Sequence, residues 1–119
     1  MRHFIWNTVL EGLLADVLML ACPMQVDQFD NANLLADEMG AAIRVCEGRD
    51  TVPDTKKLAQ ILRGSMSSDR PERIKAMDLS KKALDAIKEG GCSYTALDEL
   101  IREISNFKIS EQKRLQVQD

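Results

Sequence analysis

The hydrophobic positions follow two different rhythms in the first part of the chain. Apolar residues first recur at three- and four-residue intervals, which predicts one face of a short helix, and then form a continuous run typical of a buried strand. The helical set is Val9, Leu10, Leu13 and Leu14, and the continuous run extends from Val17 to Cys22 between Asp16 and Pro23. A helix followed by a buried strand indicates an α/β arrangement.

The middle of the chain continues this alternation. Residues 31–38 have a helical pattern that Gly40 would end, residues 42–46 form a short predicted strand, and residues 47–53 form a predicted loop. A further helix is expected with Asp54 or Thr55 as its cap and with Leu58, Ile61 and Leu62 as its core stripe. These elements predict two or three parallel strands with several helices.

The last third of the chain is predicted to be helical. Ser68 or Asp69 would start a long helix with Pro71 in its first turn, and Gly90-Gly91 would end it. Ser93 would cap a final helix. Its apolar stripe is Tyr94, Leu97, Ile101 and Ile104. We expect residues 1–107 to form one partial domain and residues 108–119 to be a polar, disordered tail.

Polar residues with binding chemistry gather around the start of the first predicted helix. Asn7 and Thr8 stand just before its apolar pattern and are expected to cap it. A helix start offers unpaired main-chain N–H groups and the positive end of the helix dipole, which together favour a phosphate. His3 would add a further donor, whereas Glu11, one turn into the helix, suits the two hydroxyls of a ribose.

A second polar pair follows the first predicted strand. Asp27 and Gln28 come shortly after its end. Ligands of doubly wound sheets lie beyond the carboxyl ends of the strands, so this pair is expected to reach the same crevice as the helix start. A carboxylate beside an amide is suited to binding neighbouring sugar hydroxyls.

These residues, taken together, resemble a known signature. The run from His3 to Gly12, then Cys22-Pro23-Met24, then the run from Asp27 to Ala32, is similar to the signature box of plant UDP-glycosyltransferases. The spacing of His, Trp-Asn, Thr, Glu, Asp-Gln and Asn-Ala matches throughout. A looser resemblance continues through residues 42–48, Val52-Pro53 and the helical remainder to about Phe107.

The resemblance implies a fold and a set of roles. The fold would be part of the Rossmann-like C-terminal half domain of a GT-B glycosyltransferase, and the chain would be a fragment that starts inside the box. The implied roles are diphosphate binding for His3, Asn7 and Thr8, ribose binding for Glu11, and sugar binding for Trp6, Asp27 and Gln28. Glutamine at the last of these positions implies UDP-glucose as donor, and the family implies neither a metal nor another cofactor.

Three positions depart from the family pattern. Phe4-Ile5 replaces a usual Cys-Gly, Asp16-Val17-Leu18 replaces Gly-Val-Pro, and Cys22 replaces a common aromatic residue. Glycine before the phosphate-binding turn would let the main chain approach the ligand, whereas isoleucine is expected to bring a side chain there.

The resemblance also implies that parts of the enzyme are missing from this chain. In the family, a preceding segment supplies the tryptophan that stacks on uracil, and an N-terminal domain binds a phenolic or flavonoid-like acceptor. That domain also supplies a histidine base. His3 is the only histidine here and matches a phosphate contact, so no catalytic residue is assigned and the fragment is expected to be inactive alone.

Composition favours a cytoplasmic globular protein. The chain is 45% hydrophobic and 29% charged, with a net charge of −3, which argues against nucleic acid as a partner. We find no signal-peptide pattern and no apolar run long enough to span a membrane. Three widely spaced cysteines, Cys22, Cys46 and Cys92, are expected to be reduced thiols, and one histidine makes a zinc site improbable.

Other interpretations remain open at this point. Taken singly, each residue has an ordinary explanation, such as a helix cap at Asn7 and Thr8 or a polar loop at Asp27-Gln28. The primary hypothesis is part of a sugar transferase that acts on a small acceptor hydroxyl. The alternatives are a non-catalytic UDP-binding or interaction fragment, and a decayed remnant with neither activity.

Overall fold

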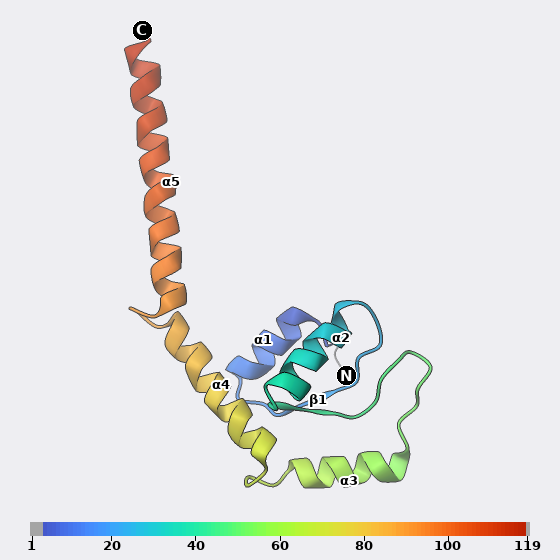
Figure 1. The fold of residues 1–119 in the computed structure, drawn as a ribbon. Helices are drawn as coiled ribbons and strands as arrows, with labels where there is room; N and C mark the ends of the chain where they lie inside the picture. The colour runs from blue at the N-terminus through green and yellow to red at the C-terminus, as the bar shows by residue number, and fades with distance from the viewer. Residues whose placement is uncertain (1–3, 119) are drawn as a thin grey trace. The chain divides into compact units, whose positions relative to one another are not determined.

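The computed structural model describes residues 4–118, which form two compact units, one up to Ala83 and one from Leu84. The first unit contains α1 (Trp6–Leu14), β1 (Met19–Ala21), α2 (Asp27–Ala32), a π-helix η1 (Asn33–Glu38), β2 (Ala42–Arg44), α3 (Thr55–Ser65) and most of α4 (Pro71–Ile87) (Figure 1). The second contains the end of α4 and α5 (Cys92–Val117).

The two strands form a parallel sheet, which confirms the predicted α/β arrangement. Met19 pairs with Ala42 and Ala21 with Arg44, and α2 with η1 makes the connection between the strands. Both strands are shorter than predicted. Val17, expected in a strand buried on both faces, lies before β1 and is 49% exposed, because each strand has only one neighbour among the described residues.

The core of the first unit is built mainly from small side chains around the sheet. Val9 of α1 is fully buried and Leu13 packs against the core, whereas Leu10 and Leu14 of the same predicted apolar set are exposed. The buried cluster consists of Phe4, Val9, Ala21, Ala32, Leu35, Ala41, Ala42 and Ala76. Five of its eight members are alanines, and these small side chains come from β1, α2, β2, α4 and the residue before β2.

The starts of the first two helices differ from the prediction. Ile5 is the N-cap of α1, so Asn7 and Thr8 lie inside its first turn and do not cap it. The helix expected from Asn31 begins earlier, at Asp27, and its last part is a π-helix in which Met39 N–H bonds to Leu34 O at 2.9 Å. Gly40 ends it as predicted, with a φ of +61° that favours glycine.

The boundaries of α3 and α4 follow the sequence signals more closely. Asp54 caps α3 by accepting a hydrogen bond from Lys56 N–H at 3.1 Å, as predicted. The α3 stripe is not a core stripe, because no α3 residue is buried and Leu62 is 47% exposed. The predicted α4 starts at Ser68 or Asp69 were wrong, since the helix begins at Pro71 and Arg70 O accepts from Ile74 N–H.

The second unit consists mainly of α5. Gly91, and not Ser93, is its N-cap, and Thr95 N–H bonds to Gly91 O at 2.9 Å. The helix continues to Val117, so residues 108–117 are helical where we expected a disordered tail. No described helix is long and apolar enough to cross a membrane.

Two cysteines are paired, contrary to the expectation of three reduced thiols. Cys22 and Cys46 form a disulfide across 24 residues, while Cys92 is free and exposed. The sheet register brings Cys22 and Cys46 near each other, because Ala21 and Arg44 are partners, Cys22 directly follows Ala21, and Cys46 comes two residues after Arg44. Their wide sequence separation gave no sign of this proximity.

Candidate functional site

The start of α1 presents main-chain donors with no acceptor in the helix. Ile5 has an extended conformation (φ −83°, ψ 163°), and its side chain makes no capping bond. The first intrahelical bond runs from Val9 N–H to Ile5 O, so the N–H groups of Trp6, Asn7 and Thr8 precede the helical ladder. His3, the remaining predicted diphosphate ligand, lies outside the described residues.

The side chains of this helix start are accessible. Trp6 is 46% exposed, Asn7 is exposed and Thr8 is half-buried. Glu11 lies one turn further along and is also exposed. Asn7, Thr8 and Glu11, from the predicted diphosphate and ribose set, therefore lie on one short helix, with the carboxylate away from its positive end.

The Phe4-Ile5 departure leaves the geometry of the helix start intact. Ile5 adopts a φ that any residue accepts, so glycine is not required for this conformation. Phe4 is only 6% exposed and belongs to the core cluster, where it anchors the chain just before α1. Ile5 is 41% exposed, as expected for a side chain placed beside the helix start.

The predicted sugar-binding pair lies in the first turn of α2, not in a loop. The turn before it has Val26 at φ +48°, with Gln28 N–H bonded to Gln25 O at 3.2 Å. Asp27 is exposed, but Gln28 is 3% exposed and its Oε1 accepts a hydrogen bond from Met24 N–H at 3.0 Å. Gln28 therefore supports the loop after β1, and only its amide nitrogen is left to donate to a ligand.

Asn31 brings the two predicted subsites together. Its Nδ2 donates to Phe4 O at 3.2 Å and to Asp27 Oδ2 at 3.4 Å. The start of α1 and the first turn of α2 are thus joined within unit 1, where the two helices lie side by side (Figure 1). Sequence reasoning assigned Asn31 no role, although a polar side chain inside a helix is a signal that something holds it.

The loops after the two strands are tied together beside this site. Gly48 N–H bonds to Pro23 O at 2.9 Å and Arg49 donates to the Gln25 side chain, in addition to the Cys22–Cys46 disulfide. The loop that leads to Asp27 is therefore held from β2. This tie fixes the carboxyl-end edge of the sheet, where the sequence placed the sugar-binding pair.

Hydrogen-bonding groups make up the chemistry of the predicted site. The predicted residues that carry amides, a hydroxyl and two carboxylates lie on α1 and α2 within the described part; they are Asn7, Gln28, Thr8, Glu11 and Asp27. Across residues 4–118, no three His, Cys, Asp or Glu side chains are grouped so as to hold a metal ion. The predicted site therefore offers hydrogen-bonding groups and no metal-binding cluster among the described residues.

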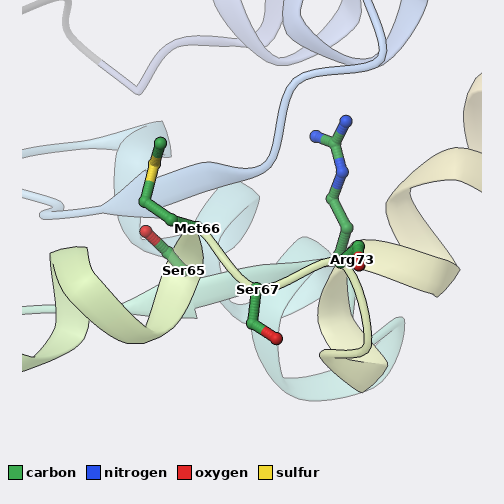
Figure 2. Close-up of a pocket in the computed structure, with 5 residues that line it drawn as sticks. Ser65, Met66, Ser67 and Arg73 are labelled. Carbon is green, nitrogen blue, oxygen red and sulfur yellow. The ribbon is translucent and has the colours of Figure 1, made fainter.

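A separate pocket of about 300 Å³ lies between the end of α3 and the start of α4 (Figure 2). It is lined by Ser65, Met66, Ser67, Ser68 and Arg73. Arg73 points away from Ser67 in this view and donates to Asp16 O at 3.0 Å. None of the residues predicted to bind the donor lines this pocket, and sequence reasoning gave no indication of it.

Comparison with known proteins gives relatives of one kind. No protein-family model matches the chain. The chain is 52% identical over 104 residues to a flavonol 7-O-rhamnosyltransferase of Arabidopsis thaliana, covering 87% of this chain and 24% of the relative. It is 43% identical over 111 residues to a flavonol 3-O-glucosyltransferase of the same plant, covering 93% and 24%. The chain spans about a quarter of the length of these curated relatives.

Solved structures agree with the sequence relatives. Arabidopsis thaliana UGT89C1 superimposes with a TM-score of 0.82 at 53% identity, over 85% of this chain and 25% of that one. Medicago truncatula UGT71G1, solved with UDP-glucose, has a TM-score of 0.75 at 24% identity over 83% and 22%, a likeness of fold alone. The fold is thus part of a Rossmann-like half domain of the GT-B glycosyltransferases. By sequence, the chain belongs with the plant UDP-glycosyltransferases.

Proposed function

We propose that this chain forms part of the donor site of a UDP-glycosyltransferase, which transfers a sugar from a UDP-sugar to a hydroxyl of a small phenolic or flavonoid-like acceptor. The observation that carries the proposal is the accessible, uncapped start of α1, with Asn7 and Thr8 in its first turn. Three main-chain N–H groups and the helix dipole favour the diphosphate at this point. His3 is assigned to the same diphosphate on the family resemblance.

The remaining contacts would order the donor along α1 and α2. Glu11, one turn from the helix start, is assigned to the ribose hydroxyls, because a carboxylate accepts two hydrogen bonds and repels a phosphate. Asp27 is assigned to the sugar hydroxyls and Trp6 to the wall of the sugar pocket. The bond path from Phe4 O through Asn31 to Asp27 supports placing the sugar near the diphosphate.

The donor sugar is proposed to be glucose, with rhamnose as the competing candidate. Glutamine at position 28 favours glucose in this family. Two observations favour testing rhamnose: Gln28 is buried with its Oε1 already bonded, and UGT89C1, 53% identical, was solved with UDP-L-rhamnose. The same protein was also solved with quercetin, which supports a flavonol as the acceptor class.

Transfer is proposed to require groups beyond those in this chain. When a complete site forms, an acceptor hydroxyl would attack the anomeric carbon with inversion, while the α1 start would stabilise the departing UDP. The single histidine is assigned to phosphate binding, so the chain alone would bind the donor without turning it over. We place the protein in the cytoplasm and propose no metal or other cofactor.

The test is a two-dimensional amide NMR titration of the isotope-labelled chain with UDP, UDP-glucose and UDP-L-rhamnose. Expected are shifts at Trp6, Asn7 and Thr8 with all three ligands, and shifts at Asp27 only with the two sugar nucleotides. Replacing Asn7 by Ala should weaken binding of all three several-fold, because one donor to a charged group is lost. Asn106→Ala, an exposed amide on α5, is the matched control.

The outcomes separate the hypotheses. A dispersed spectrum that responds to UDP but shows no sugar-dependent shifts supports the non-catalytic UDP-binding alternative. A dispersed spectrum that ignores all three ligands, or a collapsed spectrum, refutes donor binding by this chain and favours a decayed remnant. Equal weakening by Asn7→Ala and Asn106→Ala would remove α1 from the proposed site.

A further inference from the structure

Asn31 has an unusual position for a residue inside α2. Asparagine is not favoured in helix interiors, yet this side chain uses its amide in two directions at once. One hydrogen bond reaches Phe4 O, 27 residues away, and the other reaches Asp27 Oδ2, one turn back on the same helix. The residue is half-buried.

The orientation of this amide is determined by its partners. A carbonyl oxygen and an ionised carboxylate only accept hydrogen bonds, so the Nδ2 atom of Asn31 must face them both. Its two N–H groups match the two acceptors in number. An aspartate of the same shape would offer two further acceptors and a negative charge at the same point.

Two of the three linked residues, Phe4 and Asn31, are anchored to the core of the first unit. Phe4 is 6% exposed within the core, and Ala32, next to Asn31, is fully buried in the same cluster. Phe4 directly precedes Ile5, the N-cap of α1. The carbonyl of Phe4 therefore moves with the helix start. Asp27, by contrast, is exposed, and its carboxylate accepts the hydrogen bond from Asn31.

We propose that Asn31 is a positioning residue, which holds the Asp27 carboxylate at a set place relative to the start of α1. The inference rests on the proposed function, because Asp27 is the assigned sugar contact and α1 the assigned diphosphate contact. In this role Asn31 acts through Asp27 and not by contact with the donor. It fixes the separation between the protein groups that contact the two ends of the donor. Its loss should therefore weaken the sugar contact more than the diphosphate contact.

The experiment is a double-variant cycle on the full 119-residue chain, with affinities for UDP and UDP-glucose measured by calorimetry or NMR titration. Asn31→Ala should weaken UDP-glucose binding roughly three- to tenfold, the effect expected for one or two hydrogen bonds, and UDP binding by less. Asp27→Ala should do the same, and Asp27→Ala with Asn31→Ala should be no weaker than Asp27→Ala alone. Asn106→Ala should change neither affinity.

Two further readouts separate positioning from a merely structural role. The side-chain NH₂ resonances of Asn31 should shift in Asp27→Ala, which reports the link directly even if an Asn31 variant folds poorly. Asn31→Asp, which keeps the shape, should behave like Asn31→Ala or worse. A structural role would instead lower UDP and UDP-glucose affinity equally and add to the effect of Asp27→Ala.

The failures are distinguishable. Unchanged UDP-glucose binding by Asn31→Ala, or full additivity with Asp27→Ala, overturns the positioning role while leaving the proposed function in place. Absence of UDP and UDP-glucose binding by the unsubstituted chain overturns the proposed function, and the positioning role falls with it.

Discussion

The guanidinium of Arg73 donates a hydrogen bond to the main-chain oxygen of Asp16 at 3.0 Å, across 57 residues. A weaker ion pair joins Arg73 Nη2 to Asp16 Oδ2 at 3.9 Å. Asp16 lies in the turn between α1 and β1 and has a φ of +54°. The start of α4 is therefore anchored to the turn that leads into the sheet.

Replacing Arg73 by Met should destabilise the first unit. The variant keeps most of the side-chain bulk but removes the donor to Asp16 O, and we expect a loss of about 1–2 kcal/mol of unfolding free energy, since the site is partly exposed. Urea unfolding followed by circular dichroism measures this. Lys81→Met, at an exposed α4 position, is the control, and equal stability of the two variants would refute the anchor.

Asp16 occupies a position where the related family usually has glycine. The positive φ of Asp16 explains this preference, because glycine adopts such a backbone without strain. Aspartate tolerates this conformation better than most residues, whereas Ala pays the full cost of about 1–2 kcal/mol. Asp16→Ala should therefore lower the unfolding free energy by about that amount, while Asp16→Gly should stay near the parent value. The buried Oδ1 of Asp16 has no hydrogen-bond partner and Oδ2 makes only the 3.9 Å ion pair with Arg73, so losing the carboxylate itself costs little. A larger loss of unfolding free energy in Asp16→Gly than in Asp16→Ala would contradict this explanation.

The general organisation of the fold could be predicted because it depends on local patterns. The apolar run before Pro23, the turn at Gly40 and the cap at Asp54 each left a signal within a few residues. The start of α1 was missed because its N-cap, Ile5, makes no side-chain hydrogen bond. Isoleucine is not a residue type that indicates a helix start.

The long-range ties could not be predicted from one sequence. The Cys22–Cys46 pair depends on the register of two strands, and the Asn31 link to Phe4 depends on how α2 packs against α1. The joint spacing of its residues predicts the candidate site, but it does not predict the conformations of those residues. Gln28 was expected to face the sugar. Neither its burial with a bond from Met24 N–H nor the positive φ of Val26 left a signal in the sequence.

The disulfide should contribute measurably to stability. A bridge that closes a loop of this length typically adds about 2–4 kcal/mol, because it restricts the unfolded chain. Reduction, or the double variant Cys22→Ser with Cys46→Ser, should lower the unfolding free energy by that order and broaden the amide peaks of the loops after both strands. Cys92→Ser should have no effect. Labelling of three free thiols in the native, non-reduced chain would show that the bridge does not form.

Glu72 makes the stability of α4 sensitive to acid. A hydrogen bond from its own main chain, aided by Arg70 at 3.0 Å, lowers the pKa of Glu72 below its usual 4.5, although burial opposes the shift. Because the folded-state pKa is depressed, the stabilisation is complete above the unfolded-state value and is lost as the pH falls through the lowered pKa.

The corresponding measurement compares the chain with Glu72→Gln across this range. The variant should be less stable at neutral pH, and the difference should shrink as the pH falls below about 4.5. Glu103→Gln, at an exposed position of α5, is the control for a general effect of removing one charge. A difference that stays constant from neutral to acid pH would exclude Glu72 as the source.

Val26 is held in a conformation that a β-branched residue rarely adopts, with φ +48° and ψ −127°, directly before Asp27 and Gln28. Its side chain is 82% exposed, so packing does not account for valine there. Val26→Gly should relieve the strain and raise the unfolding free energy by about 1 kcal/mol after the entropy loss of glycine is counted. Val52→Gly, at an 88% exposed loop position that itself has no positive φ, should lower it slightly.

The same pair of variants tests whether the strain serves the site. A glycine at position 26 loosens the turn that sets the direction of Asp27, so UDP-glucose binding should weaken while stability rises. Val52→Gly should leave binding unchanged. If Val26→Gly gains stability and keeps its full affinity for UDP-glucose, the strained turn has no part in donor binding. If it loses stability, the strain at position 26 is smaller than the entropy cost of a glycine, which contradicts a strained turn.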